Sequence, residues 1–537
     1  MCGFVVLLND NNFNTQTLLN SIAHRGPDSS KTISVNNWKF GFNRLGIVGG
    51  KDFDQPYSED KNLNVLVFNG EIYNFRNLAK KYLPDLNNVI SDTQVLYNLL
   101  MVYGVEIIKK LDGIFSFIFV NTVSDKCILS RDTFGVKPLY YAKKGSSLYF
   151  SSEIKPLATI INQSFSSNGL LEHFSFGSPL DNRTIYKEIY SFESGSYEIL
   201  GKNTKSISKK NFKFHASSNN NKSIEEILKE TIEMQTPEIP FGVLYSGGID
   251  SSLILNQTHK NHNMKLALSV NVDQEDMSEL YWQKHGLEKI QYSKKVKTFD
   301  QNKNSFSLEN LEQIISKVDL PITHPNFLGA LMLAKEAKSF GLKVLLSGEG
   351  ADEIFMGYKW FIERKFNNLD ALNYVPIDLV SKALNHSKVP SYNYINKLSK
   401  KNFFTQYYLR KWLLRADITG MAHSVEVRVP FLGSNIVKAA ELISDGEMTN
   451  FDSITKHPLK KIAENKFGKK FTYRKKIGFD YPLNEWVGEE YVDYLLNNCN
   501  LFCRDSIKSI CDMRNNHFYY PRLIFLLTAF TIWVNNK

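Results

Sequence analysis

The stretch that most constrains this chain is FGVLYSGGIDSS at residues 241–252. A short apolar run at residues 243–245 is typical of a buried strand, and the residues from Asp250 onward can continue as a helix. Two adjacent glycines between them let the backbone turn sharply and point successive N–H groups inward. Serine hydroxyls and the positive end of a helix add further donors, so the turn predicts a cup for a polyanion. The GxxxxGK[ST] phosphate loop is excluded because its lysine is missing.

The string SGGIDS at residues 246–251 resembles the pyrophosphate loop of enzymes that split ATP between its α and β phosphates. An ordinary serine-glycine turn between a strand and a helix is the alternative interpretation. Asp250, Ser251 and Ser252 fall where a magnesium pyrophosphate needs ligands, which favours the nucleotide. The resemblance therefore implies ATP as a substrate, Mg²⁺ as its metal and an adenylation reaction. The loop does not identify what is adenylated.

Bulk properties exclude several classes of protein. A chain of 537 residues is expected to form more than one domain. The formal net charge is +10, but Lys and Arg are scattered among Asn and Ser, so we expect a solvated surface and no nucleic-acid partner. Attraction of anionic ATP or of nucleic acid is the alternative interpretation of this charge. The five cysteines do not suggest a disulfide framework, and Cys499, Cys503 and Cys511 lack a fourth ligand at zinc spacing.

Neither end of the chain predicts a membrane segment. No basic region precedes the short apolar segment near the N-terminus, unlike in a signal peptide. The longest late apolar run, residues 523–534, is too short to cross a bilayer and predicts a core helix. We expect a cytoplasmic protein whose partners are small molecules rather than membranes. The sequence leaves the oligomeric state open, and a homodimer is compatible with it.

Strands dominate the first 200 residues. Apolar runs predict them at residues 2–8, 65–68, 114–120 and 139–141, and helical periodicity predicts helices at 75–82 and 93–103. Two layers of sheet flanked by helices fit this pattern.

Cys2 is the candidate nucleophile of this half. Removal of Met1, which a small second residue favours, leaves Cys2 with both a thiol and a free α-amine. The amine has an ordinary pKa of roughly 8, so part of it is neutral at working pH and can accept the thiol proton. One residue can thus supply both nucleophile and base. The alternative is a cysteine that stands at position 2 by chance or is simply buried.

The segments that follow Cys2 favour the catalytic interpretation. They are MCG (1–3), HRGPD (24–28), RLGIV (44–48), QP (55–56), NGEIYN (69–74), SDT (91–93), RDTFGVKPLYY (131–141) and SSEIK (151–155). In this order they closely resemble the N-terminal-nucleophile glutaminase domain of class II glutamine amidotransferases over nearly all of residues 2–200. The resemblance implies an α+β fold, a two-layer β sandwich flanked by helices.

The same resemblance implies a role for each matching residue. Cys2 attacks the side-chain amide of glutamine, forms a thioester and releases ammonia, while Asn69 and Gly70 form the oxyanion hole. Arg44 holds the α-carboxylate of glutamine and Asp92 holds its α-amine, in keeping with their charges. Three further residues complete the pocket: Ile47, Val48 and Glu71. Two departures from the family remove no chemical role: Gly46 in place of Ser or Ala, and Gln94 in place of Glu.

A polar, basic stretch rich in Asn and Ser separates the two halves of the chain. We predict a glutaminase domain at residues 2–205, a linker at 206–223 and a second domain at 224–537. In the second domain helices and strands alternate, at 224–234, 241–245, 266–272, 328–340 and 343–346. This is the βαβ pattern of a parallel sheet that binds ligands at the carboxyl ends of its strands. Beyond residue 357 the pattern is helical and rich in aromatic residues.

A second strand end carries SGEGADEIFMGY at residues 347–358, with carboxylates at Glu349, Asp352 and Glu353. A solvated acidic turn is the alternative, but a magnesium pyrophosphate needs carboxylates opposite the loop at Asp250. Two further strings match as well: LRADITGMAHSVEVRVPFLG (414–433) and RKKIGFDYPLNEW (474–486). Together they resemble the synthetase domain of asparagine synthetases and β-lactam synthetases over residues 224–490. The resemblance implies an α/β parallel-sheet pyrophosphate-loop domain with a helical C-terminal part.

This second resemblance also implies a site. Asp250 and Asp352 are expected to bind Mg²⁺, and Glu349 to act as acid or base beside an acyl-adenylate. Lys476 is expected to stabilise charge at the reacting phosphate and carbonyl. The residues expected around ATP are Leu244, Ser246, Gly247, Gly248, Asp250, Ser251, Val270, Ser347 and Gly348.

The two resemblances combine into glutamine-dependent amide synthesis. An acceptor carboxylate attacks the α-phosphorus of ATP, and ammonia released at Cys2 passes through the interior to the acyl-AMP, sheltered from water that would protonate it. The family implies aspartate as acceptor and asparagine as product. Two residues depart where the acceptor is expected: His324, in DLPITHPN (319–326), replaces an acidic residue, and Gly433 replaces Asp. His324 is either a neutral structural replacement or the mark of another acceptor, such as a sugar acid or a peptide carboxylate.

Functions of another class are less well supported. An RNA-thiolating enzyme predicts paired CxxC cysteines or an RNA-binding appendage, and the sequence has neither. A catalytically silent binding protein is expected to have lost Cys2, Asp250 or Glu349, and the sequence retains all three.

Overall fold

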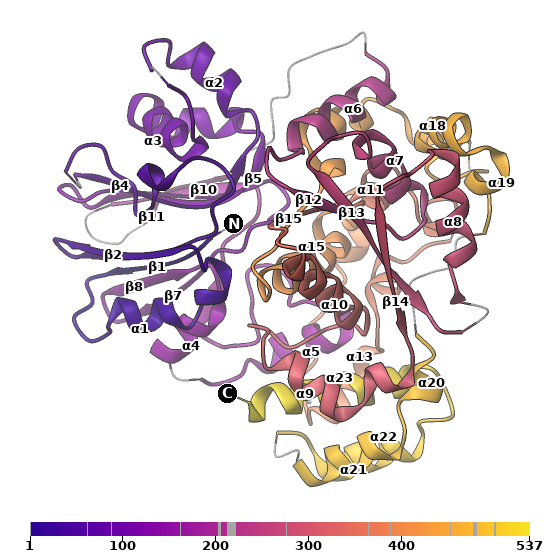
Figure 1. The fold of residues 1–537 in the computed structure, drawn as a ribbon. Helices are drawn as coiled ribbons and strands as arrows, with labels where there is room; N and C mark the ends of the chain where they lie inside the picture. Colours follow the sequence, from indigo (N-terminus) through magenta and orange to yellow (C-terminus); the bar gives the residue numbers. More distant parts are fainter. Residues whose placement is uncertain are drawn as a thin grey trace.

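The computed structural model describes residues 2–536 except 62, 87, 162, 202–205, 212–221, 275–276, 364, 387, 452, 476–480 and 499–500. Two halves of the chain lie side by side (Figure 1). The N-terminal half carries two antiparallel sheets, and the C-terminal half carries one parallel sheet among helices. Both predicted fold classes are confirmed.

The sheets of the N-terminal half form two layers. The first has the strand order β2-β3-β1-β8-β7-β9 and the second has the order β11-β10-β6-β5-β4. The strands are β1 (Gly3–Leu8), β2 (Ser29–Val35), β3 (Trp38–Arg44), β4 (Asn64–Ile72), β5 (Gly113–Asn121), β6 (Lys126–Arg131), β7 (Tyr140–Lys144), β8 (Ser147–Ser151), β9 (Ile189–Ser191), β10 (Ser196–Leu200) and β11 (Ser206–Asn211).

The two layers pack because their strands are apolar on both faces. In β5, Ile118 and Val120 face β1 and β3 of the other sheet, whereas Phe115 and Phe117 face outward under helices. The helices α2 (Phe75–Tyr82) and α3 (Asp92–Tyr103) cover this outer face. The helices α1 (Thr15–Asn20) and α4 (Ile154–Ile160) cover the outer face of the first sheet. The sandwich therefore has one core between the sheets and one under each helical layer.

The linker begins later than predicted. Residues Ser206–Asn211 form β11, an edge strand that pairs antiparallel with β10. The basic, Ser-rich composition that suggested a linker also suits an exposed edge strand, where lysines discourage pairing with another chain. The linker predicted at 206–223 therefore overlaps β11 in its first six residues, and residues 212–221 lie outside the described part of the chain.

The C-terminal half is built on a parallel sheet with the order β14-β13-β12-β15-β16. Its strands are β12 (Phe241–Leu244), β13 (Met264–Val272), β14 (Lys295–Gln301), β15 (Val344–Leu346) and β16 (Glu426–Arg428). The predicted pyrophosphate loop follows β12, and the acidic string follows β15. Because neighbouring parallel strands end at the same edge of a sheet, the two segments meet there.

Helices surround this sheet and continue to the C-terminus. They are α5 (Ser167–Phe176), α6 (Ile224–Gln235), α7 (Ile249–Thr258), α8 (Leu280–Lys289), α9 (Leu308–Ile315), α10 (Asn326–Ser339), α11 (Ala351–Ile354), α12 (Asn368–Leu372), α13 (Ile377–Ala383), α14 (Lys400–Phe403), α15 (Leu409–Met421), α16 (Ser434–Glu441), α17 (Asp445–Met448), α18 (His457–Phe467), α19 (Lys469–Thr472), α20 (Leu483–Trp486), α21 (Glu489–Asn498), α22 (Arg504–Asp512) and α23 (Tyr519–Asn535).

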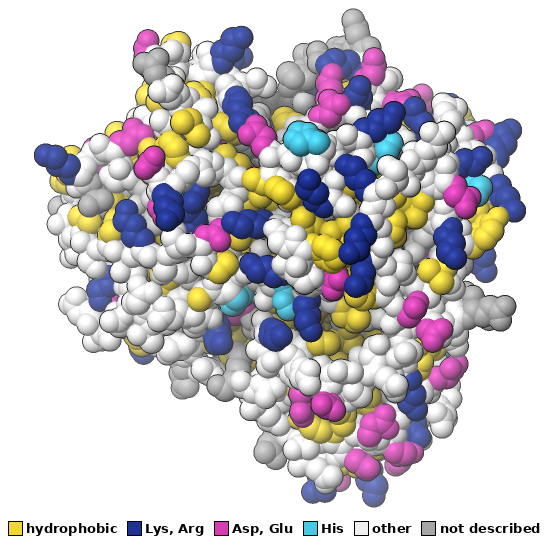
Figure 2. Space-filling model, in the orientation of Figure 1, with side chains coloured by type: hydrophobic (Ala, Val, Ile, Leu, Met, Phe, Trp, Pro, Cys, Tyr) yellow, Lys and Arg dark blue, Asp and Glu magenta, His cyan; other side chains and the backbone are white. Residues whose placement is uncertain are grey.

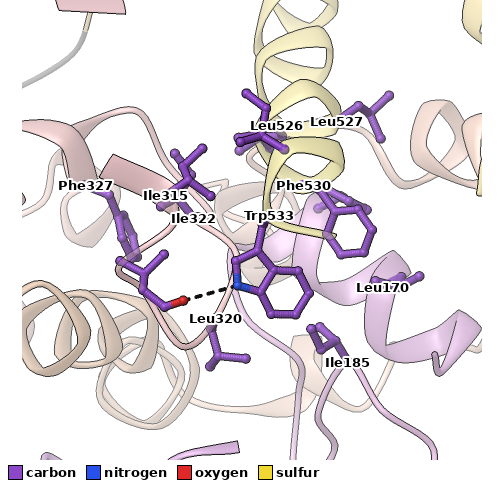
Figure 3. Close-up of a cluster of buried hydrophobic side chains, with 14 of the residues drawn as sticks. Leu170, Ile185, Ile315, Leu320, Ile322, Phe327, Leu526, Leu527, Phe530 and Trp533 are labelled. Carbon is purple, nitrogen blue, oxygen red and sulfur yellow. Dashed lines mark hydrogen bonds between the residues drawn. The ribbon is translucent and has the colours of Figure 1, made fainter. Parts of the chain in front are cut away.

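The last helix, α23, is a core helix, as its apolar sequence predicted. Figure 3 shows Phe530 and Trp533 packed among Leu170, Ile185 and Leu320. The indole nitrogen of Trp533 donates a hydrogen bond to the Val318 carbonyl at 3.3 Å. This contact fixes the chain just before the segment 319–326, which carries His324. In the part of the chain that the structure describes, no helix is long and apolar enough to span a membrane.

Candidate active sites

Cys2 directly precedes β1 and is buried, with 8% of its surface exposed. Its backbone N–H donates to Asn69 Oδ1 at 3.1 Å. The other side-chain atom of Asn69, the donor Nδ2, is buried and has no hydrogen-bond partner among the described residues. A buried donor without a partner beside a thiol is what an oxyanion hole offers to a ligand. The geometry brings together the predicted nucleophile and the predicted oxyanion donor.

Gly70 follows Asn69 in β4 and has a φ of +146°. A Cβ atom at this position would lie 2.0 Å from the carbonyl oxygen of Ile114 in β5. Only glycine fits here, so the backbone next to Asn69 depends on this close approach of two strands.

We expect Gly70→Ala to lower the free energy of unfolding by about 3 kcal/mol, because the new methyl group overlaps backbone at a φ that alanine avoids. Glutaminase activity of the folded fraction should fall with it. Thermal unfolding measures the first effect and glutamate release the second. Gly50→Ala is the matched control, since φ there is −87° and no atom lies within 4 Å of an added Cβ. A Gly70→Ala protein as stable as this control would contradict the close approach.

Arg44 is held in place by the loop that follows it. Its Nη2 donates to the carbonyls of Val48 at 3.3 Å and Gly49 at 2.8 Å, and its Nε lies 3.1 Å from Asp54 Oδ1. Val48 thus orients the predicted carboxylate-binding guanidinium through its carbonyl. A contact of Val48 with glutamine stays a prediction.

Asp92 and Glu71 are both buried near this loop. Asp92 begins α3 and accepts hydrogen bonds from the N–H groups of Ile72 at 3.1 Å and Thr93 at 2.9 Å. Burial raises the pKa of Asp92 to about 6. A bound ammonium group beside Asp92 would lower this pKa again and so stabilise the charged carboxylate. Glu71 lies 3.5 Å from Nη2 of Arg428, which belongs to the other half of the chain. Burial also raises the pKa of Glu71, against the pull of Arg428.

The predicted pyrophosphate loop closes on itself after β12. Ser251 Oγ accepts a hydrogen bond from the N–H of Ser246 and lies 3.2 Å from the Ser246 hydroxyl, and the N–H of Gly248 donates to that hydroxyl at 3.3 Å. Gly247 has a φ of +79°, and a Cβ there would lie 3.0 Å from the backbone nitrogen of Gln283. The predicted cup therefore forms at the start of α7.

The segment after β15 packs directly against this cup. A Cβ on Gly348 would lie 2.9 Å from Cβ of Asp250, so the two loops touch through a glycine. Ser347 donates its N–H to the Arg428 carbonyl at 2.9 Å. Leu244 ends β12, and Val270 lies near the end of the neighbouring β13. The sheet gathers the predicted ATP-binding residues along one edge.

Lys456 is the residue of this site that the sequence did not reveal. Its Nζ lies 2.8 Å from both carboxylate oxygens of Asp250 and 2.7 Å from Oδ1 of Asp352. It stands just before α18 with a φ of +56°, and the two carboxylates raise its pKa. A lone lysine among 65 basic residues gives no signal in the sequence. Lys456 nonetheless forms ion pairs with both predicted metal ligands.

The geometry fits the predicted metal in part. Asp250 and Asp352 converge on the Nζ atom of Lys456, and their oxygens are the hard donors that Mg²⁺ prefers, so a Mg²⁺ bound by both would take the position of this ammonium group. Among the described residues, no group of three or more His, Cys, Asp or Glu side chains could hold a metal by itself. A Mg²⁺ held here would need phosphate oxygens to complete its shell.

Glu349 lies next to this edge. Its Oε1 accepts a hydrogen bond from Nη2 of Arg415, and its Oε2 is buried without a hydrogen-bond partner among the described residues. The guanidinium of Arg415 stacks 4.8 Å from the Trp412 ring, which fixes its plane. Lys476, the other predicted catalytic residue of this half, lies outside the described residues.

Both halves match known families. Residues 1–213 match the glutamine amidotransferase domain, and residues 223–501 match asparagine synthase. A glutamine-hydrolysing asparagine synthetase of Bacillus subtilis is 30% identical, across 93% of this chain and 89% of that protein. Those of Sandersonia aurantiaca and Arabidopsis thaliana are 28% and 27% identical, across 97% and 98% of this chain and 93% and 86% of theirs.

The chain belongs to the asparagine synthetase family. In this family member a buried charge cluster joins the two halves. Arg25, 1% exposed, donates from Nε to the Cys2 carbonyl at 3.1 Å and from Nη1 to Asp417 at 2.9 Å and Glu153 at 3.0 Å. Lys137 Nζ lies 3.9 Å from Asp417. Because Asp417 and Arg415 lie on the same helix, α15 contacts the surroundings of both Cys2 and Glu349.

An apolar contact lies beside this charge cluster. Leu45 and Ile47 of the glutaminase half pack against Met421, the last residue of α15. Ile47, predicted to contact glutamine, thus also faces the synthetase half. Apolar side chains at this point exclude water from the junction of the two halves.

His324, predicted to lie where the acceptor binds, lies among aromatic rings and cations. Its ring centroid lies 4.5 Å from that of Tyr374 and 5.5 Å from that of Trp412, and Nδ1 accepts from the N–H of Asn326 at 3.3 Å. Burial lowers the pKa of His324 well below its ordinary value, and the nearby cations Lys411, Arg415 and Arg522 lower it further. His324 is therefore neutral at physiological pH.

Gly433 packs against α6. A Cβ there would lie 2.4 Å from Cγ2 of Thr231 in α6. Gly433 precedes α16, and Asp112 of the glutaminase half accepts the N–H of Ser434 at 3.2 Å. The structure thus gives position 433 a place at a helix terminus whose cap comes from the other half, and a bearing of Gly433 on the acceptor stays a prediction.

Proposed function

We propose that this protein synthesises asparagine from aspartate, ATP and glutamine, with AMP, pyrophosphate and glutamate as the other products. The observation that carries the proposal is the contact of one helix, α15, with both sites: Asp417 binds the arginine at Cys2, and Arg415 binds Glu349. Two half-reactions are thereby held in one rigid arrangement. The choice of aspartate as the acceptor rests on the names of the relatives, which are glutamine-hydrolysing asparagine synthetases.

In the glutaminase half, Cys2 attacks the side-chain amide carbon of glutamine. Its buried thiol has a raised pKa, so the proton must leave to a nearby base, and the α-amine freed by removal of Met1 is that base. The Nδ2 donor of Asn69 stabilises the oxyanion of the tetrahedral intermediate. Ammonia leaves, a thioester remains on Cys2, and water hydrolyses it to glutamate.

In the synthetase half, a carboxylate of the acceptor attacks the α-phosphorus of ATP. The cup at residues 246–251 receives the pyrophosphate with its N–H and hydroxyl donors, and Lys456 holds the carboxylates of Asp250 and Asp352 beside it. Mg²⁺, when bound by these two carboxylates, supplies further charge neutralisation on the phosphates. Ammonia then attacks the acyl carbon and expels AMP. Glu349 accepts the proton that the attacking nitrogen loses.

The same chemistry on another acid is the second candidate function. Neutral His324 in an aromatic setting, where many asparagine synthetases have an acidic residue, favours it. A sugar acid or a peptide carboxylate would then replace aspartate.

Product analysis distinguishes the two candidates. We expect the purified protein, supplied with ATP, Mg²⁺, glutamine and aspartate, to release AMP and asparagine in equal amounts, as measured by chromatography. Glutamine-dependent AMP release with another acid, and no asparagine with aspartate, would overturn the aspartate proposal and leave the second candidate. Basic side chains are spread over both halves on the face seen in Figure 2, which gives no reason to expect a nucleic-acid substrate.

A further inference from the structure

Lys411 is a buried cation of α15 that the scheme above leaves without a role. Its side chain is 6% exposed, and its Nζ lies 4.0 Å from the ring centroid of Tyr408 and 5.1 Å from that of Trp412. Among the described residues, no carboxylate lies within ion-pair distance of Nζ, and no acceptor forms a hydrogen bond with it. A lysine so deeply buried needs an anion to offset the loss of hydration.

The surroundings of Lys411 are those of the predicted acceptor site. Trp412, whose ring lies near Nζ, also contacts His324 and carries Arg415 on its face. Arg415 in turn binds Glu349. An unbroken series of contacts therefore runs from Lys411 to the carboxylate beside the predicted acyl-adenylate.

Among the described residues, no carboxylate forms an ion pair that would balance the positive charge of Lys411. Glu349 is paired with Arg415, and Asp352 is paired with Lys456. Glu353, the carboxylate that acts most strongly on Lys411, is buried and accepts the Tyr358 hydroxyl at 2.7 Å, and it forms no ion pair with Lys411. An acidic residue at position 324 would supply a negative charge, but His324 is neutral.

We infer that Lys411 binds a second anionic group of the acceptor, so that the acceptor is an acid with two negative charges. One carboxylate is activated beside Glu349, and the other anionic group lies at Lys411. The α-carboxylate of aspartate is such a group, and so is the phosphate of a phosphorylated sugar acid. This inference rests on the proposed amide synthesis.

The test compares pairs of acids that differ by one anionic group. The first pair is aspartate and its α-amide; the second is glucuronate 1-phosphate and glucuronate. The full-length protein is assayed for AMP release with ammonia as nitrogen donor, so that the Cys2 site plays no part. The variants are Lys411→Met and, as the matched control that keeps the charge, Lys411→Arg.

We expect the wild-type protein to prefer the doubly charged acid of the active pair. Lys411→Met should raise KM for that acid about 30-fold with kcat within about threefold, and should leave KM for the singly charged acid unchanged, because an ionic contact made in the ground state is lost. Lys411→Arg should stay within about threefold of wild type. Equal use of both members of a pair by wild type, or an unchanged preference in Lys411→Met, would overturn the inference.

A second pair of variants guards against misfolding of Lys411→Met. His324→Asp places a carboxylate in the cluster that competes for the cation, whereas His324→Asn keeps the position neutral and retains an acceptor for the Asn326 N–H. We expect KM for the doubly charged acid to rise about tenfold in His324→Asp and to change little in His324→Asn. Equal effects of the two changes would count against the inference.

The dependence of KM on pH gives an independent readout. Burial lowers the pKa of Lys411 to about 7, with Glu353 opposing the shift and Arg522 adding to it. The ammonium form therefore predominates below about pH 7, and KM for the doubly charged acid should rise between pH 7 and 8.5. Since Glu353 and His324 also face Lys411, Lys411→Arg is the control: its KM should stay flat, and a rise there would assign the effect to Glu353.

The outcome separates this inference from the proposed function. AMP release with the sugar-acid pair but not with the aspartate pair would overturn the proposal of asparagine synthesis and would still support the role of Lys411. AMP release from neither pair would overturn both.

Discussion

Cys2→Ala should abolish amide synthesis from glutamine and leave synthesis from ammonia close to the wild-type rate. The thiol is the only group at this site placed to attack the glutamine amide among the described residues, whereas externally added ammonia reaches the acyl-AMP without it. Loss of a nucleophile typically lowers such a rate by many orders of magnitude, here to the detection limit. Amide formation is measured by chromatography with glutamine and with ammonium chloride as separate nitrogen donors.

Cys127→Ala is the matched control for this change. Cys127 is also buried in the glutaminase half, in β6, and burial raises the pKa of its thiol, so it is a packing residue. Both nitrogen donors should serve the Cys127→Ala protein. If Cys2→Ala lost synthesis from ammonia as well, with its fold intact by circular dichroism, the separation into two sites would be wrong.

Asp250→Asn should abolish synthesis from both nitrogen donors while glutamine hydrolysis continues. The change removes one of two carboxylates that converge on Lys456 and leaves the shape of the cup unchanged. We expect AMP release to fall on the order of a thousandfold, because the loss of a predicted Mg²⁺ ligand leaves the negative charge of the phosphates less well neutralised. Radiolabelled AMP and free glutamate, measured in the same reaction, report the two half-reactions.

Asp445→Asn controls for the loss of one carboxylate in the same half. Asp445 is exposed at the start of α17 and forms no ion pair with Lys456, so its replacement should leave both half-reactions unchanged. An Asp250→Asn protein that still released AMP at the wild-type rate would show that the cup at residues 246–251 is not the nucleotide site.

The sequence predicted most of the elements that carry the two sites. The strand at residues 2–8 places Cys2, and the helix at 93–103 places Asp92 at its start, because apolar periodicity determines these elements locally. The parallel sheet followed from the βα alternation, and because parallel strands end at one edge, Asp250 lies next to Gly348.

What the sequence could not predict depends on contacts between distant segments. Lys456 reaches Asp250 across 206 positions, and nothing near it in sequence marks it as functional. Asp319, in the string that suggested the acceptor, instead accepts the N–H groups of Ile154 and Lys155 at 2.8 Å each and so caps α4. The cap of α16 is another such contact, because Asp112 accepts the N–H of Ser434 from 322 positions away. Tertiary contacts of this kind have no local pattern.

The contacts between the halves bear on whether the two halves could exist as separate subunits encoded by two genes. Separation would leave Arg25 without Asp417, Arg428 without Glu71 and the first turn of α16 without Asp112. Arg25 would keep Glu153 and Arg428 would keep Glu426, but the partners from the other half would be replaced by water. A subunit arrangement of this enzyme would therefore have to re-form these polar contacts across a surface that the single chain buries.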